Sequence, residues 1–131
     1  MNVTFSDLED RTNSLNGTVA RDRERLLQIL EGLRNRPPFA RELTGDNGFL
    51  LDVGIGTLGH AQYCRSDGEP PYLLAVAPPP RRAGRSVELL VGGTPTPIAS
   101  RYCMPFHWVS EIAGYFLETG RAHPAFMWED A

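Results

Sequence analysis

Glycine, histidine and cysteine provide the spacings that most suggest chemistry in this chain. Gly54-Ile55-Gly56-Thr57-Leu58-Gly59 matches the G-x-G-x-x-G pattern of dinucleotide-binding loops and directly follows a predicted strand. Such a loop holds a pyrophosphate only where a helix begins within it. Here the sequence returns at once to strand-like alternation. We therefore interpret these glycines as turn residues and as strand positions where neighbouring groups come close.

Two histidine–cysteine spacings could in principle supply zinc ligands. They are His60-x-x-x-Cys64 and Cys103-x-x-x-His107. Residues four apart on a strand lie ~13 Å from each other, whereas zinc ligands converge to within ~2.3 Å of one ion. On a strand, His60 and Cys64 therefore cannot share a zinc ion. Cys103 and His107 flank a helix start and could approach each other, but two ligands make a poor site. We expect structural thiols, packed or exposed imidazoles, no metal and no cofactor. The motifs of zinc proteases, serine hydrolases and P-loop nucleotidases are also missing from the sequence. We expect no catalytic residues and a protein that is not an enzyme.

Composition narrows the class further. The chain has 131 residues and a formal net charge of −3, which suits one domain over residues 1–131. Its 13 basic residues are all arginine and are outnumbered by 16 acidic ones, so a nucleic-acid-binding surface is not expected. No apolar run approaches the ~18 residues that cross a bilayer. The first residues resemble no secretion signal. We expect a cytoplasmic protein without membrane contacts.

Two amphipathic helices are predicted to pack on the remainder. The first begins at Thr18, as N-cap, and ends near Arg34 or Asn35, before Pro37-Pro38. In the second, Pro105 suits the first helical position, an apolar stripe follows, and Gly120 suits the left-handed position after the last turn.

Strand patterns fill most of the chain between these helices. Residues 49–55 alternate apolar and polar side chains, as expected of a strand with one buried face. Further strands are predicted at 3–5, 58–64, 72–77, 86–91 and 125–128. The prolines of 92–97 restrict that segment to a sheet edge or an extended connection. The predicted fold class is α+β, a mostly antiparallel sheet with two helices.

Several ordered motifs resemble the first-numbered immunity protein family of bacterial polymorphic toxin systems. The likeness covers about residues 46–128. It rests on Asp46-Asn47-Gly48-Phe49-Leu50-Leu51, Gly54-Ile55-Gly56, Gln62-Tyr63, Asp67-Gly68-Glu69-Pro70-Pro71-Tyr72, Gly92-Gly93-Thr94-Pro95-Thr96-Pro97-Ile98, the Pro105 helix and Trp128. The resemblance implies a non-enzymatic antitoxin, which binds a cognate toxin domain, often a deaminase, and obstructs its substrate cleft.

The charge distribution is compatible with that role. Residues 42–69 carry five carboxylates, Glu42, Asp46, Asp52, Asp67 and Glu69, against Arg65 alone. A toxin that accepts polynucleotide presents a basic groove, and clustered carboxylates can occupy it by imitating phosphate charge. On this argument the predicted partner-binding residues are Asp46, Asp67, Glu69 and Tyr72, with Asp52 if it faces outward and Trp108 if it is exposed.

Two other interpretations stay open at this point. The chain could be a small enzyme or ligand-binding domain that uses the Gly54–Gly59 loop with His60 and His107. It could also be a former immunity protein that now serves as an orphan interaction module.

Overall fold

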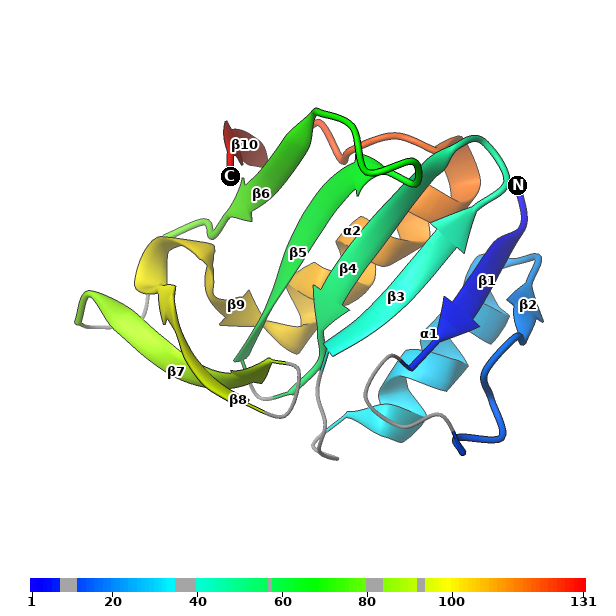
Figure 1. Cartoon of the computed structure of the whole chain (residues 1–131), viewed down its shortest axis with the longest axis horizontal. Coiled ribbons are helices and arrows are strands. Elements are labelled where there is room, and N and C mark those ends of the chain that lie inside the picture. The colour runs from blue at the N-terminus through cyan, green and yellow to red at the C-terminus, as the bar shows by residue number, and fades with distance from the viewer. Residues whose placement is uncertain (8–11, 35–39, 57, 80–83, 92–93) are drawn as a thin grey trace.

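An antiparallel sheet dominates the computed structural model of the chain, which describes residues 1–7, 12–34, 40–56, 58–79, 84–91 and 94–131 (Figure 1). The strands are β1 Val3–Ser6, β2 Val19–Ala20, β3 Ala40–Gly45, β4 Phe49–Gly54, β5 Leu58–Arg65, β6 Tyr72–Val76, β7 Ser86–Val91, β8 Thr94–Ala99, β9 Met104–Pro105 and β10 Met127–Asp130. The helices are α1 Arg23–Leu33, the 3-10 turn η1 Ser100–Tyr102, and α2 Phe106–Thr119. The predicted α+β class is confirmed.

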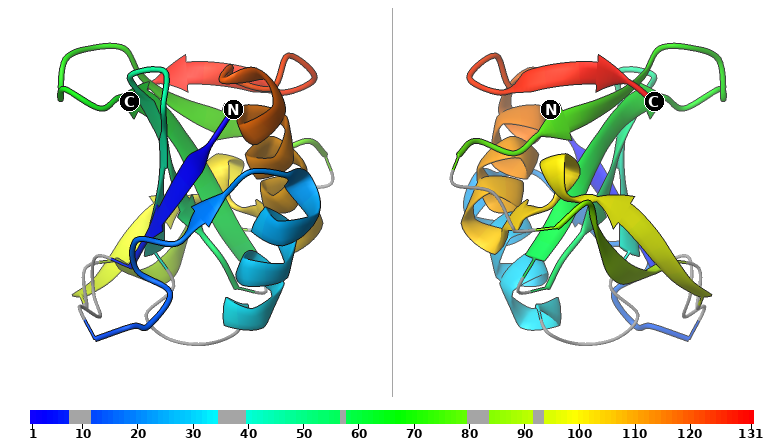
Figure 2. Two further views of the ribbon diagram at one scale, coloured as in Figure 1. Left: turned by 90° about the vertical axis from the view of Figure 1, so that its right-hand side faces the viewer. Right: turned by 90° about the vertical axis from the view of Figure 1, so that its left-hand side faces the viewer.

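The strands form one large sheet and one separate hairpin. In the large sheet the order is β10-β6-β5-β4-β3-β1-β2, all antiparallel, and β9 pairs with the start of β5. Strands β7 and β8 pair with each other. Figure 2 shows α1 and α2 on one side of the large sheet and the β7–β8 hairpin on the other. We call the side under the helices the core face and the other side the open face.

Alternation along the strands separates these two faces. On β4, Leu51 and Val53 are fully buried, whereas Asp52 between them is half-buried. The core face packs against the apolar stripe of α2, whose Val109, Ile112 and Phe116 are at most 1% exposed. Burial of large apolar side chains is the main favourable term in folding, so the core face holds the fold together.

Helix α2 agrees closely with its prediction. It follows Pro105, which is the N-cap residue, one position before the first helical turn. Gly120 ends the helix at φ 74°, and its N–H donates to the Phe116 carbonyl at 2.7 Å. The Gly120 carbonyl in turn accepts from the Tyr63 hydroxyl and from Asn47 Nδ2, both at 2.9 Å. This helix end is therefore tied to the sheet.

The predicted start of α1 is wrong by several residues. Asp22, and not Thr18, is the N-cap, and its carboxylate accepts from the Arg25 N–H at 2.8 Å. Val19, which fitted the helical stripe, instead lies in β2 opposite Thr4. The carboxylate of Asp22 satisfies an otherwise unpaired helical N–H, which explains the later start.

One further strand differs from expectation, and another fits one of two alternatives. Strand β3 was not predicted, and it lies centrally between β1 and β4. Thr94–Ala99 forms β8, so the edge alternative was right for that segment, while Gly92 and Gly93 lie outside the described residues. Within the part of the chain that the structure describes, no helix is long and apolar enough to cross a membrane.

Candidate partner-binding surface

The open face carries a row of directly opposed side chains across six strands. From β1 to β10 the paired positions are Ser6, Glu42, Asp52, Gln62, Leu74 and Glu129. We call this set the cross-strand row. Directly opposed residues bring their Cβ atoms to within ~5.5 Å. Three carboxylates and one amide therefore share a single line on the face that the helices leave uncovered.

Two of these carboxylates, Glu42 and Asp52, face each other on neighbouring strands. Burial, and after it the charge of Glu42, together raise the pKa of Asp52 to about 6. The Thr44 hydroxyl donates to Glu42 Oε1 at 3.2 Å. Among the described residues, neither carboxylate has an ion-pair partner. Like charges directly opposed on a sheet are destabilising, so this acidic pair costs folding free energy.

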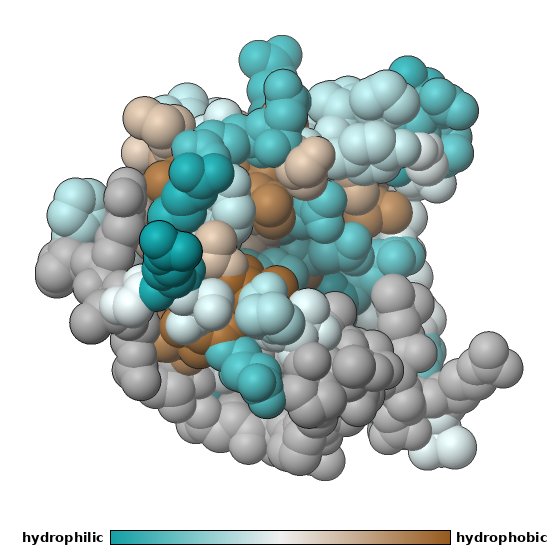
Figure 3. All heavy atoms as spheres, turned by 60° about the vertical axis from the view of Figure 1, so that its left-hand side comes forward, coloured by the Kyte–Doolittle hydropathy of each residue, from teal (hydrophilic) through white to brown (hydrophobic). Residues whose placement is uncertain are grey.

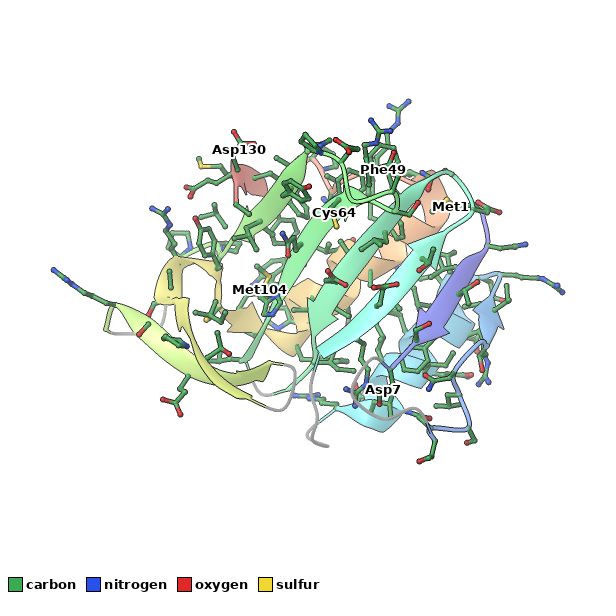
Figure 4. The ribbon with its side chains drawn as sticks, in the orientation of Figure 1. Met1, Asp7, Phe49, Cys64, Met104 and Asp130 are labelled. Carbon is green, nitrogen blue, oxygen red and sulfur yellow. The ribbon has the colours of Figure 1, made fainter. Side chains whose placement is uncertain are left out.

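Cys64 reports the same negative field. Cys64 lies on β5 (Figure 4). Its register partners are Leu50 on β4 and Tyr72 on β6. Burial, and after it the charges of Asp52 and Glu42, together raise the pKa of its thiol to about 11. At neutral pH the thiol is protonated and therefore a poor nucleophile. The field around it favours cations.

The predicted loop residues lie together at one end of the sheet. The β3–β4 turn carries Asp46 and the β5–β6 loop carries Asp67 and Glu69, and the Ser66 N–H donates to the Gly48 carbonyl at 2.9 Å between them. Figure 1 shows both connections at the top of the sheet. Asp46 and Glu69 are exposed.

The carboxylate of Asp67 is already paired within its own loop. The Glu69 N–H donates to Asp67 Oδ1 at 2.9 Å, and Arg65 pairs with Asp67 Oδ2. These contacts, with the backbone hydrogen bond first, lower the pKa of Asp67. Tyr72 is 40% exposed, and its hydroxyl donates to the Gly68 carbonyl, so it braces the same loop.

Asp52 was predicted as a contact residue if it faces outward, and Trp108 if it is exposed; the structure meets only the first condition. Asp52 faces outward, on the open face. Trp108 belongs to α2, which packs on the core face, and it is half-buried with its ring edge-to-face against Phe126 at 5.5 Å between centroids. The structure therefore does not bring Trp108 to the surface that the other five residues form.

Sequence reasoning missed a cavity of about 370 Å³ between the open face and the hairpin. Its floor is His60, Gln62 and Leu74, its roof is Pro97, Ile98 and Ala99, and Tyr102 and Ala131 close its sides. Figure 3 shows hydrophobic side chains gathered in a hollow on this face, bordered by hydrophilic ones. Burial lowers the pKa of His60 to about 4, so its imidazole is neutral at pH 7. The cavity depends on the hairpin folding over the sheet, for which the sequence carries no local signal.

The glycine motif is followed by a strand and not by the helix that a dinucleotide-binding loop requires. Strand β5 begins at Leu58, so no helix begins in this loop, and Thr57 lies outside the described residues. A Cβ on Gly59 would lie 1.8 Å from the Gly54 carbonyl oxygen, which confirms that a close approach requires glycine there. His60 lines the open-face cavity, whereas His107 is exposed on α2. Among the described residues, no three histidine, cysteine or acidic side chains form a group that could hold a metal.

Comparison of the chain with models of known protein families and with curated proteins finds no match.

Proposed function

We propose that this chain is a non-enzymatic immunity protein, which binds a cognate polymorphic toxin, of deaminase type, and occludes its active site. The open face is the surface that enters or covers the toxin's basic cleft. Glu42 and Asp52 form its centre, and Asp46, Glu69 and Tyr72 extend it at one end of the sheet.

The opposed acidic pair is the observation that carries this proposal. An isolated fold gains nothing from two carboxylates held face to face and partly shielded from water. A partner that brings a cation between them offsets the repulsion and desolvates the pair at the same time. Such a pair therefore contributes to stability in the complex and subtracts from it in the free protein.

The charge elsewhere on the surface is consistent with a basic partner. Asp46 and Glu69 are exposed at the loop end and would steer a basic partner towards the sheet. Arg65 is held by Asp67, so its positive charge is partly neutralised within the loop. Electrostatic steering of this kind raises association rates and weakens with salt.

No specific observation favours the enzymatic alternative. It needed His60 and His107 to converge near the Gly54–Gly59 loop. His60 lines the cavity on the open face, whereas His107 is exposed on α2, which packs on the core face. An orphan interaction module would use the same open face with another partner. The two functions are separated by what the protein encoded beside this chain does.

The test is co-expression with the protein encoded by the adjacent gene. We expect a stable complex, and survival of cells that the neighbouring protein alone would kill. Isothermal titration calorimetry with the purified partner then compares the affinities of two double variants that have equal changes in net charge. Glu42→Gln/Asp52→Asn removes the acidic pair, and Glu24→Gln/Glu31→Gln removes two carboxylates on α1, in the helical layer.

We expect the first double variant to lose ~10-fold or more in affinity, because in the parent complex the two carboxylates would be desolvated against the partner. The affinity of the second double variant should change less than ~2-fold. Equal effects of both variants would contradict the proposed surface. A neighbouring protein that is harmless and does not co-purify would contradict the immunity function itself.

A further inference from the structure

The cavity beneath the β7–β8 hairpin has walls of two kinds. Leu74 on the floor and Ile98 on the roof are apolar, whereas Gln62 and His60 on the floor supply neutral hydrogen-bonding groups. A pocket of a few hundred cubic ångströms with apolar walls and a few polar groups is the usual form of a specific binding site. Its floor belongs to the open face, so it is part of the surface proposed to meet the partner.

Carboxylates lie on both sides of the cavity floor. In the cross-strand row, Gln62 is flanked by Asp52 on β4, and Leu74 is flanked by Glu129 on β10. An anionic group in the cavity would be repelled from the side of Asp52. A purely apolar group would leave the floor amide of Gln62, and Asp52 beside it, without new partners. The surroundings therefore select a cation with an apolar stem.

One side of this arrangement already binds a guanidinium of the chain itself. Arg101 contacts Glu129 Oε1 at 2.9 Å and lies 4.9 Å above the centre of the Tyr102 ring. The Tyr102 hydroxyl also donates to Glu129 at 2.7 Å. At the other side, the described residues provide no such cation for Asp52 and Glu42. The rim is thus neutralised at β10 and left negative at β4.

We propose that the cavity receives an arginine side chain of the partner protein, with its methylene groups between Leu74 and Ile98 and its guanidinium directed to Gln62 and to the neighbouring Asp52. This inference rests on the proposed function and identifies the chemistry of the partner's anchor. Arginine fits better than lysine because its planar head offers five donors to several acceptors and is more weakly hydrated. A buried arginine at the centre of an interface commonly carries much of the binding energy.

The experiment uses capped arginine as the probe, so that it does not depend on the partner. N-acetyl-arginine amide is titrated into the isotopically labelled full chain, and the side-chain amide of Gln62 is followed by NMR. N-acetyl-citrulline amide, which has nearly the same shape and no charge, is the matched control. We expect saturable shifts at Gln62 with a dissociation constant on the order of millimolar for arginine, and at least ~10-fold weaker binding for citrulline.

Two variants locate the probe. Asp52→Asn removes a carboxylate at the rim and should weaken binding of capped arginine at least ~5-fold. Glu31→Gln, on α1, should leave it unchanged. Absence of saturable shifts, or equal binding of arginine and citrulline, overturns the inference. Equal binding by the Asp52→Asn variant and the parent overturns it as well.

Failure of this inference is distinguishable from failure of the proposed function. If capped arginine binds at Gln62 but the adjacent gene encodes no toxin that co-purifies, the arginine site stands and the immunity function is wrong. If the toxin binds while capped arginine gives no shifts at Gln62, the immunity function stands and the arginine site is wrong.

Discussion

Along β4, Leu51 and Val53 point into the core, while Asp52 between them points to the open face. The same alternation on β5 places Ala61 and Tyr63 against the helices, and His60 and Gln62 under the hairpin. One face thus contains the large buried side chains. The other contains opposed carboxylates, a protonated thiol and a cavity.

Under the proposed function, the core face provides stability and the open face provides recognition. On the core face each side chain is surrounded by others, so a change of one methylene is felt throughout the packing. On the open face the acidic pair works against folding, and its removal should stabilise the free protein. Residues that lower stability while lying on an uncovered surface are typical of binding sites. The following predictions test this separation.

Truncation in the core should have the largest effect. Phe116→Ala removes a ring that is fully buried and edge-to-face with Tyr63 at 6.0 Å between centroids. We expect a loss of about 3–5 kcal/mol in the free energy of unfolding, measured by urea denaturation. Gln62→Ala on the open face is the control and should cost less than ~1 kcal/mol. Similar losses for the two variants would remove the distinction between the faces.

A close backbone approach on the core face should give the next largest effect. Gly59→Ala places a Cβ against the Gly54 carbonyl, and the backbone must move to accept it. We expect destabilisation of up to ~3 kcal/mol. In Gly32→Ala, on helix α1, nothing lies within 4 Å of the new Cβ. That variant should gain ~0.5–1 kcal/mol, so opposite signs are expected from one type of substitution in the same urea assay.

Asp52→Asn should stabilise the protein in a pH-dependent way. The folded-state pKa of Asp52 is raised from 3.8 to about 6, so the folded chain holds this proton more tightly than the unfolded chain. Stability from this group is therefore complete below pH 3.8 and is lost as the pH rises to about 6. We expect the variant to equal the parent at pH 3.5 and to exceed it by ~1–3 kcal/mol at pH 7.5. A constant difference across this range would contradict the raised pKa.

Charge reversal in the loops should affect stability least. Glu69 is exposed, so Glu69→Lys should change the free energy of unfolding by less than ~0.5 kcal/mol. It should slow association with the partner several-fold, and added salt should reduce the difference. Asp67→Lys should be less stable than Glu69→Lys, because Asp67 pairs with Arg65 and accepts the Glu69 N–H. Stopped-flow association at two salt concentrations separates the two effects.

Sequence patterns predicted the elements whose signals are local. Helix α2 has an apolar stripe and a terminal glycine, and strands β4 to β7 have alternating or apolar runs. Strand β3 was missed because Arg41 occupies a core-facing position, where it forms a buried ion pair with Asp7 at 3.5 Å. Strand β8 was ambiguous because of Pro95 and Pro97. Proline has no N–H to donate, and residues two apart on a strand direct their backbone groups to the same edge. A strand with these two prolines can therefore pair on its other edge, and in the described residues β8 pairs only with β7.

The candidate surface was predictable only in part, because only some of its features have local sequence signals. The alternation around Asp52 indicated its outward direction, and the two acidic turns could be expected to meet at one sheet end. Glu42 stood in the acidic segment but was not selected, because its strand was not predicted. The cavity joins β5 and β6 to β8, which lies far along the chain, and no pattern in the sequence specifies that contact.

The β7–β8 hairpin is built so that it can vary without disturbing the rest of the molecule. In the described residues, β7 and β8 pair only with each other. At the end of the hairpin, the Ser100 N–H donates to the Arg85 carbonyl at 2.9 Å. A replacement hairpin of another length or shape would leave every strand pairing of the large sheet in place. Such a replacement would change the roof of the cavity, at Pro97, Ile98 and Ala99, while its floor on β5 and β6 stays the same.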